Sequence, residues 1–279
     1  MDDVVNQSQL EELWESRYHY GNVQKRIARQ CKWDSYYSMI YAKEIGKPFH
    51  LAQNELVNYL TEQRIVDSND TVLDIGCGTG TYGLPLAARC SHVTELDGNL
   101  TAIKVVEERA AQAGLTNIRM VCKLWEEFNE EKQYDVVLSA MCPAICNFED
   151  LYRMESLAKR QCVIITVMEG SYDKHRSNII RELGLKPEGM ITESRIYLKA
   201  LQFLSREVKL QTYSYKYEYR ISLQQMLDTY PTYLSIFGMS EKETVSFIKD
   251  YFMKNAVDGM IMDESQMNIA VISWNKEMK

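Results

Sequence analysis

The stretch VLDIGCGTG, residues 72–80, decides the fold of this chain. An apolar run ends in an acid and is followed by three glycines at alternate positions, with a helix-like segment behind them. This order predicts a buried strand that turns sharply beneath a nucleotide-like ligand, because glycine lets the backbone adopt unusual dihedral angles and approach a ligand closely. The spacing is G-x-G-x-G, whereas a dinucleotide site requires G-x-G-x-x-G and position 81 is a threonine. The glycine spacing therefore points away from NAD.

The next predicted strand carries a second acid at its end. Residues 92–96 read His-Val-Thr-Glu-Leu, and Asp97 follows them. An acid at the tip of this strand can accept both hydroxyls of a bound ribose. The interval between Gly80 and Asp97 accommodates one crossover helix and a short strand. On the glycine triplet, its spacing and this acid, the sequence resembles the class I S-adenosylmethionine-dependent methyltransferases over roughly residues 50–170.

The resemblance implies an α/β fold of the Rossmann-like type, with a seven-stranded, mostly parallel sheet, helices on both faces and an antiparallel last strand. It also implies S-adenosylmethionine as the cofactor and S-adenosylhomocysteine as its product. Asp74 would hold the methionine portion indirectly, Asp97 would bind the ribose, and the glycine loop would bring backbone amides to the ligand. The residues expected to contact the cofactor are Asp74, Gly76, Cys77, Gly78, Thr79, Gly80, Asp97, Gly98, Leu124, Trp125, Glu126 and Ser139.

The adenine end departs from the common pattern of these enzymes. The superfamily often places an acid after the third strand, where it receives the adenine amino group. Here Leu124 stands at that position, within the stretch VCKLWE of residues 121–126. Two alternatives stay open: Trp125 stacks on the purine, or Glu126 replaces the acid if the register shifts by two. Trp125 is equally consistent with a simple core anchor.

Strands alternate with helices along the middle of the chain. This alternation implies right-handed crossovers and a parallel sheet, whose ligands bind beyond the carboxyl ends of the strands. The predicted strands are 71–75, 92–96, 117–121, 134–139 and 161–168, and the predicted helices between them are 81–89, 99–113 and 148–159.

The two ends of the chain are predicted to elaborate this core. Residues 1–47 are interpreted as a helical cap, and residues 48–279 as the methyltransferase domain, with an aromatic-rich elaboration at 171–260. In the predicted strand 208–221 four alternate tyrosines share one face. That face is interpreted as half-buried sheet surface, with an aromatic wall over the substrate or a homodimer contact as alternatives. A strand at 267–274 is predicted to be the last.

Composition limits the partners and the compartment. The net charge is −7 without a block of Lys or Arg, which argues against binding dominated by nucleic-acid phosphates. No apolar run approaches the ~20 residues that span a bilayer, and the acidic start is not a secretory signal, so a cytoplasmic protein is expected. The seven cysteines are mainly interpreted as buried hydrophobes. Cys142 and Cys146 alone cannot complete a zinc site, and no metal is expected.

Three residues are weak candidates for a catalytic role. Cys142 lies in the loop after the fourth predicted strand, where the superfamily brings its substrate to the methyl group. Glu169 and His175 follow the fifth strand, where a general base could reach an acceptor. A surface position in a helix is the alternative for His175. The sequence shows no other catalytic group, as expected for a reaction that depends mainly on alignment.

These features predict a cytosolic methyltransferase that acts on an oxygen, nitrogen or sulfur atom of a small molecule by direct in-line displacement. A nucleic-acid or protein methyltransferase is the first alternative, and it would require a basic groove at the strand ends. A non-catalytic protein that binds S-adenosylmethionine is the second, and a nicotinamide-dependent dehydrogenase the third.

Overall fold

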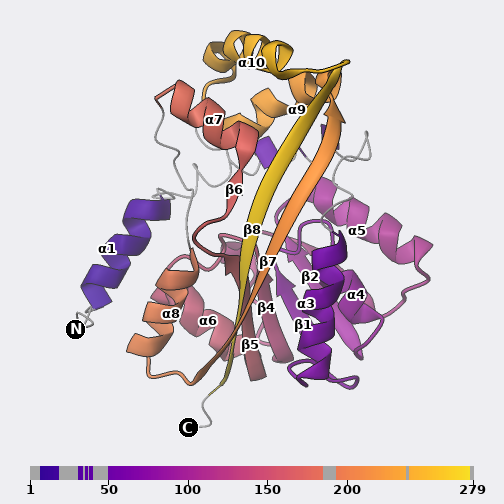
Figure 1. Cartoon of the computed structure of the whole chain (residues 1–279). Coiled ribbons are helices and arrows are strands. Elements are labelled where there is room, and N and C mark those ends of the chain that lie inside the picture. Colours follow the sequence, from indigo (N-terminus) through magenta and orange to yellow (C-terminus); the bar gives the residue numbers. More distant parts are fainter. Residues whose placement is uncertain are drawn as a thin grey trace.

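The computed structural model describes residues 7–18, 31–33, 35–36, 38–39, 50–184, 193–236 and 239–276. Within these ranges eight strands form one mixed sheet, in the order β3-β2-β1-β4-β5-β8-β6, with β7 paired to β8 (Figure 1). The expected Rossmann-like, mostly parallel sheet is confirmed, and one short strand is added to the seven expected.

Five neighbouring strands are parallel, with β3 at the edge of the sheet. They are rich in Val, Ile and Leu because helices cover both of their faces. These strands are β1 (Thr71–Ile75), β2 (His92–Asp97), β3 (Ile118–Cys122), β4 (Tyr134–Ala140) and β5 (Ala158–Val167).

The last three strands are antiparallel to their neighbours. β8 (Met260–Asn275) pairs with β5 through its second half only, from Ile269 onwards. The long β7 (Val208–Ser222) pairs with β8 over its whole length. The two-residue β6 (Tyr172–Asp173) pairs with β8 beyond the end of β5. The ribbon of β7 and β8 therefore continues past the carboxyl ends of the parallel strands (Figure 1).

Two apolar layers hold helices to the sheet. On one face α3 (His50–Glu62) and α4 (Gly83–Ala87) share a core with Val72 of β1 and Val163 of β5. α5 (Leu100–Gln112) packs beside α4. The opposite face carries α6 (Phe148–Leu157) and α8 (Glu193–Phe203).

The N-terminal helix α1 (Gln7–Tyr18) joins the second layer. The Trp14 ring meets the Phe148 ring at 5.4 Å and the Tyr197 ring at 5.9 Å, both edge to face. Most of the predicted cap at 1–47 lies outside the described residues. No described helix is both long enough and apolar enough to cross a membrane.

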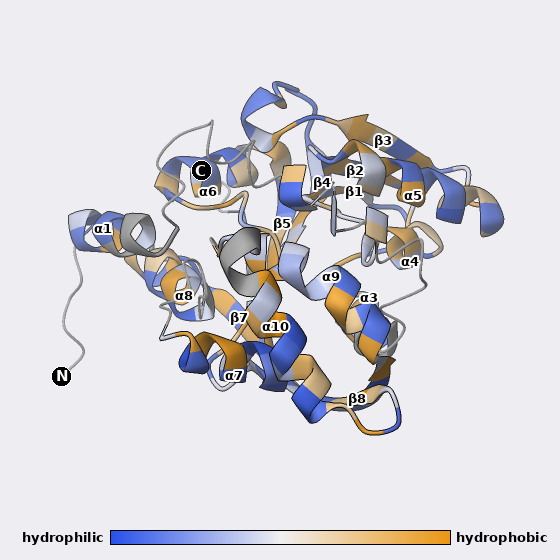
Figure 2. Cartoon of the chain, turned by 90° about the horizontal axis from the view of Figure 1, so that it is seen from above, coloured by the Kyte–Doolittle hydropathy of each residue, from blue (hydrophilic) through white to orange (hydrophobic). Residues whose placement is uncertain are grey.

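A separate apolar core lies beyond the sheet. It joins α7 (Lys174–Glu182), α9 (Leu223–Ile236) and α10 (Glu241–Asn255) to the far ends of β7 and β8. We call these three helices, with β6 and the ribbon residues 215–222 and 260–267, the distal unit. In Figure 2 the distal unit faces the viewer, and α9 and α10 lie between α8 and α3.

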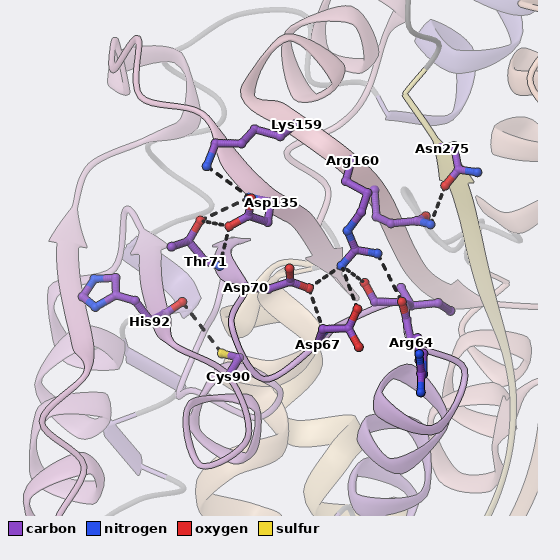
Figure 3. A network of polar contacts seen from close by, with 12 residues as sticks. Arg64, Asp67, Asp70, Thr71, Cys90, His92, Asp135, Lys159, Arg160 and Asn275 are labelled. Atoms are coloured by element: carbon purple, nitrogen blue, oxygen red, sulfur yellow. Dashed lines mark hydrogen bonds and ion pairs between the residues drawn. The ribbon is translucent and has the colours of Figure 1, made fainter.

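The amino ends of the parallel strands are tied together by polar side chains (Figure 3). Arg160, at the start of β5, donates to the backbone carbonyls of Arg64 and Ile65 and forms an ion pair with Asp70. Asp135 accepts two hydrogen bonds from Thr71, at 2.7 and 2.8 Å. This network lies at the end of the sheet opposite to the carboxyl ends.

Besides the added strand β6, the structure differs from the sequence prediction in three elements. α8 was not predicted, although Ile196, Tyr197, Ala200 and Leu201 form its buried face. The predicted helix 81–89 is shortened to α4, because the glycine loop continues to residue 82. β8 begins at Met260 instead of position 267, because its first half pairs only with β7 and β6.

Glu155 of α6 joins three elements at a buried point. Its carboxylate accepts hydrogen bonds from Arg206 at 2.8 and 3.0 Å and from the indole N–H of Trp274 at 2.8 Å. The pair is nearly buried, with 9% of the Glu155 side chain and 15% of the Arg206 side chain exposed. Loss of one partner would leave the other charge buried and uncompensated.

We therefore expect Glu155→Ala to lower the free energy of unfolding by about 3 kcal/mol in urea denaturation. The matched control is Glu207→Ala, which removes an exposed acid next to Arg206. This control should change the free energy of unfolding by less than about 0.5 kcal/mol. A loss below about 1 kcal/mol for Glu155→Ala would show that the buried pair is not needed for stability.

Candidate functional site

Four loops meet at the carboxyl ends of the adjacent strands β3, β2, β1 and β4. The loop after β1, residues 76–82, is called the glycine loop here. Its glycines at 76, 78 and 80 have φ values of 71°, 56° and 76°. Side chains would strain the backbone at such angles, and glycine does not. The predicted cofactor residues of β1, β2 and β4 thus lie at one edge of the sheet.

The glycine loop is fastened to the end of β2. The carbonyl oxygen of Leu96 accepts the N–H groups of Gly76 and Cys77, at 2.7 and 3.0 Å. The carboxylate of Asp97 accepts the N–H of Gly78 and that of Asn99, both at 2.8 Å. Asp97 is only half-buried beside the loop.

The other side of the glycine loop is fixed by α5 and β4. Arg109 of α5 donates to the carbonyl oxygen of Thr79 at 3.0 Å. Ser139, buried at the end of β4, donates to the carbonyl oxygen of Ile75 at 3.3 Å. Ser139 is therefore held beneath the loop and supports the backbone there.

The Cys142 thiol lies directly against the backbone of Gly76. A methyl group in place of the Gly76 hydrogen would collide with the sulfur, so this close approach requires glycine. The preceding residue, Met141, is exposed and has a φ of 51°, which is uncommon for a residue with a side chain. The loop after β4 is thereby bent over the start of the glycine loop.

Two carboxyl groups lie buried directly below the glycine loop. Asp74 and Glu95 are paired residues of β1 and β2 and are 1% and 0% exposed. None of their four oxygens has a hydrogen bond of full geometry within the described part of the chain, although the Gly83 N–H near Asp74 and the Cys77 thiol near Glu95 slightly favour the ionised forms. The Glu95 carboxylate lies so close to Gly83 that a methyl group there would overlap it.

Burial makes ionisation of this pair unfavourable. Burial, followed by the negative charge of Asp97, raises the pKa of Asp74 to about 7, against smaller opposing effects of the Gly83 N–H and of Glu95. Burial, followed by the charge of Asp74, raises the pKa of Glu95 well above its usual range. Two adjacent carboxyls in such surroundings keep a proton at neutral pH.

At the predicted adenine end, Leu124 and Trp125 lie in different environments. Leu124 is half-buried and packs on Gly98, and the Lys123 N–H next to it donates to the Asp97 carbonyl oxygen at 3.0 Å. Trp125 is 4% exposed, and its N–H donates to Asp150 at 2.8 Å. The Arg153 guanidinium lies 3.9 Å from the Trp125 ring centre. These contacts are those of a core anchor, and Glu126 is exposed.

The two residues predicted as candidate general bases differ in burial. Glu169 is exposed and forms an ion pair with Arg195. His175 is buried in the distal unit, not on a helix surface. Its Nδ1 lies 3.0 Å from the Tyr251 hydroxyl and its Nε2 lies 3.0 Å from the Met262 carbonyl oxygen. Both ring nitrogens therefore have partners within the distal unit.

Sequence reasoning missed Glu95 and Arg109. The only local signal for Glu95 is an acid inside the otherwise apolar strand that begins at His92. The contact of Glu95 with Asp74 depends on the register of two strands and is not visible in either segment alone. Within the described residues, no group of three or more His, Cys, Asp or Glu side chains could hold a metal ion.

Comparisons with known proteins agree with this geometry. A family model described as a methyltransferase domain matches residues 72–162. A solved structure from Bacillus halodurans, provisionally assigned as a methyltransferase, has a TM-score of 0.51 at 14% identity. The comparison covers 80% of this chain and 99% of that one, and it shows the same fold.

Two relatives in sequence differ in how much of the chain they match. An uncharacterized protein of Haemophilus influenzae is 24% identical over 250 residues, which is 88% of each chain. Ribosomal RNA small subunit methyltransferase G of Laribacter hongkongensis is 27% identical over 124 residues. That match spans 44% of this chain and 58% of the ribosomal RNA enzyme.

The buried acid pair has a consequence for stability. A carboxyl whose pKa is raised in the folded protein binds more protons there than in the unfolded chain, so stability falls as pH rises. We expect Glu95→Gln to remove one such proton. Relative to the wild type, the variant should gain stability by up to about 1.4 kcal/mol per pH unit as the pH rises above the ordinary carboxyl pKa of 4.5.

Urea denaturation at each pH measures this difference directly. Glu131→Gln makes the same replacement at an exposed acid, and its free energy of unfolding should equal that of the wild type at every pH. Parallel curves for wild type and Glu95→Gln would mean that the pair does not retain a proton.

Proposed function

Because the chain belongs to the class I S-adenosylmethionine-dependent methyltransferase superfamily, we propose that it methylates an oxygen, nitrogen or sulfur atom of a small molecule. The enzyme class and the cofactor follow from the methyltransferase domain at residues 72–162. The size and kind of the acceptor are inferred from the parts of the chain that surround the candidate site.

The observation that carries this proposal is the position of the distal unit. The β7–β8 ribbon continues past the carboxyl ends of β1, β4 and β5, and α7, α9 and α10 lie on that side of the sheet (Figures 1 and 2). A covered site favours an acceptor that can be enclosed, since enclosure excludes water from the reaction. A long polymer would require open access.

The tyrosine face of β7 supports the interpretation as a wall of this site. Tyr213 packs against the Tyr59 ring of α3, at 6.2 Å, and the Tyr215 hydroxyl donates to Glu55 at 2.8 Å. Tyr217 lies next along the strand, close enough for its charge to raise the pKa of Tyr82, after the larger effects of burial and Asp74. The tyrosines thus extend from α3 past the glycine loop.

The same face continues into polar groups of the distal unit. The Tyr219 hydroxyl donates to Asp263 at 3.1 Å. Asp173 accepts from the Tyr230 hydroxyl at 3.1 Å, and Arg176 donates to the Tyr233 hydroxyl at 2.7 Å. Hydroxyl, carboxylate and guanidinium groups in one place can orient a small polar acceptor.

Part of the N-terminal segment also contacts the distal unit. Lys32 donates to the carbonyl oxygen of Ser235 at 2.6 Å, and the Tyr36 ring lies 5.3 Å from the Tyr233 ring. These contacts support a cap role for the part of the segment around Lys32 and Tyr36, whereas α1 packs in the second layer. The division into a cap at 1–47 and a methyltransferase domain at 48–279 is part of the proposal. In this arrangement the cap and the distal unit would enclose the acceptor together.

S-adenosylmethionine, when bound, supplies an electrophilic methyl group with a neutral leaving group. The chain then has to hold the donor, align the acceptor and exclude water. Asp97 and the glycine loop would hold the ribose and the methionine portion, with Leu124 and Gly98 beside the purine. Alignment alone can contribute roughly 7–11 kcal/mol, which fits a direct in-line displacement. No general base is assigned to Glu169, His175 or Cys142.

The alternative of a ribosomal RNA acceptor is favoured by several relatives in sequence that are ribosomal RNA methyltransferases. The match to ribosomal RNA small subunit methyltransferase G spans 124 residues. Against it stand the net charge of −7 and the absence of a Lys/Arg block in the sequence. Neutralising phosphates requires clustered cations.

The ribose role of Asp97 can be tested by titration calorimetry. We expect Asp97→Ala to weaken binding of S-adenosylmethionine and S-adenosylhomocysteine by about 10- to 100-fold, because a hydrogen bond to a charged acceptor is lost. Glu131→Ala, the exposed control, should bind as the wild type does. Unchanged affinity in a folded Asp97→Ala sample would contradict the proposed role.

The acceptor class can be tested with methyl-labelled S-adenosylmethionine and cell extract. We expect the wild type to transfer label to the fraction below about 1 kDa, since pockets of the usual volume enclose molecules of that size. Asp97→Ala should reduce the rate at low cofactor concentration. Label in RNA or protein instead would replace the small-molecule proposal with one of its alternatives.

A further inference from the structure

The Asp74–Glu95 pair is buried but lies directly beneath the glycine loop. Asp74 is one residue before Ile75, at which β1 ends, and Glu95 is two residues before Asp97 at the end of β2. The two residues are in register on neighbouring parallel strands, so their side chains lie on the same face of the sheet. Any charge that binds at the glycine loop is therefore near both carboxyls.

The groups that face the pair carry no positive charge. They come from every neighbouring element: Asp97 at the end of β2, Cys77 in the glycine loop, Tyr82 before α4 and Cys90 after it. The main effects on the pKa of either acid come from burial, the neighbouring acids and nearby hydrogen-bond donors, and none of them from a Lys, Arg or His. The neighbourhood can thus gain a cation without displacing one.

Two adjacent buried carboxylates with only weak donors are costly, and a proton shared between them removes most of that cost. The shared proton compensates one negative charge of the pair, and a cation bound nearby could compensate the same charge. In surroundings of low dielectric constant a positive charge acts over several ångströms, so direct contact with the pair is not required.

We propose that Glu95 is a positioning residue for the cofactor: it shares a proton with Asp74, and the pair releases that proton to solvent when the cationic methionine portion of S-adenosylmethionine binds at the glycine loop. The positive charge of the ligand then replaces the proton as the partner of the pair. Glu95 thereby makes cofactor affinity depend on pH. This property concerns the methyl donor and is independent of the acceptor.

Titration calorimetry of the full-length protein tests the release of the proton. Binding is measured at pH 6.5 in phosphate and in Tris, whose ionisation enthalpies differ, so that the difference in heat counts the protons. At this pH the α-amino group of the ligand is already protonated, and released protons come from the protein. We expect the wild type to release about half a proton or more per S-adenosylmethionine.

The pH dependence of affinity gives a second readout. Because the cation prefers the pair that has lost a proton, the wild type should bind S-adenosylmethionine about fivefold more tightly at pH 7 than at pH 6. Glu95→Gln should release clearly fewer protons than the wild type and show a smaller difference in affinity between the two pH values, because only Asp74, whose pKa burial and Asp97 still raise, can then titrate. Glu131→Gln should behave as the wild type.

A ligand without the amino-acid portion tests whether the positive charge of that portion causes the proton release. 5′-Methylthioadenosine should bind the wild type without proton release, since it carries neither the ammonium nor the sulfonium charge. If Glu95→Gln does not fold, Asp74→Asn provides the same loss of the shared proton. The comparison of the two ligands on the wild type needs no variant.

Equal proton release by wild type and Glu95→Gln, or by both ligands on the wild type, would overturn the proposal. Failure of the folded wild type to bind S-adenosylmethionine at all would instead contradict the cofactor. Label in RNA or protein would change only the proposed acceptor, so the three failures can be told apart.

Discussion

The junction between β1 and β2 is the constraint on which the candidate site depends. One carbonyl oxygen, that of Leu96, takes two N–H groups of the glycine loop, and the Asp97 carboxylate takes one more from the loop and one from Asn99. The position of the loop is thus set by backbone hydrogen bonds to the neighbouring strand. A slip of β1 against β2 by one residue would place Asp74 and Glu95 on opposite faces of the sheet and separate the loop from Asp97.

The central strands could be predicted because their signals are local. β1 matches its predicted range, and β2 and β4 each extend one residue further than predicted. An apolar run bounded by glycine or by an acid identifies a buried strand without knowledge of its neighbours. The first half of β8 has no such signal, because residues 260–266 mix apolar and acidic side chains. Its strand structure depends on its pairing with β7, which no segment of the sequence reveals alone.

The candidate site also has one part that local sequence signals predict and one part that depends on strand pairing. The glycine loop and Asp97 could be located from residue types and spacing, since these residues follow one another closely in the chain. The acid pair could not, because it exists only through the register of two strands. The role of Trp125 could not be predicted from its residue type, because a tryptophan near a purine site can stack on a ligand or fill a core. The contacts that decide between these roles are with Asp150 and Arg153 of another element.

The β7–β8 ribbon also determines how the covered site can open. Each residue of β7 from Val208 to Ser222 is paired with one of β8, without a bulge. The crossing from β5 to β6 is held as well, since Asn268 of β8 bonds to Ser171 and to the Glu169 carbonyl oxygen. Within the described residues these connections tie the distal unit to the sheet along the whole ribbon, with Gly170, whose φ is 80°, between β5 and β6. Exchange of ligands then involves bending of the ribbon or movement of elements that contact the distal unit, more than rotation of a free lid.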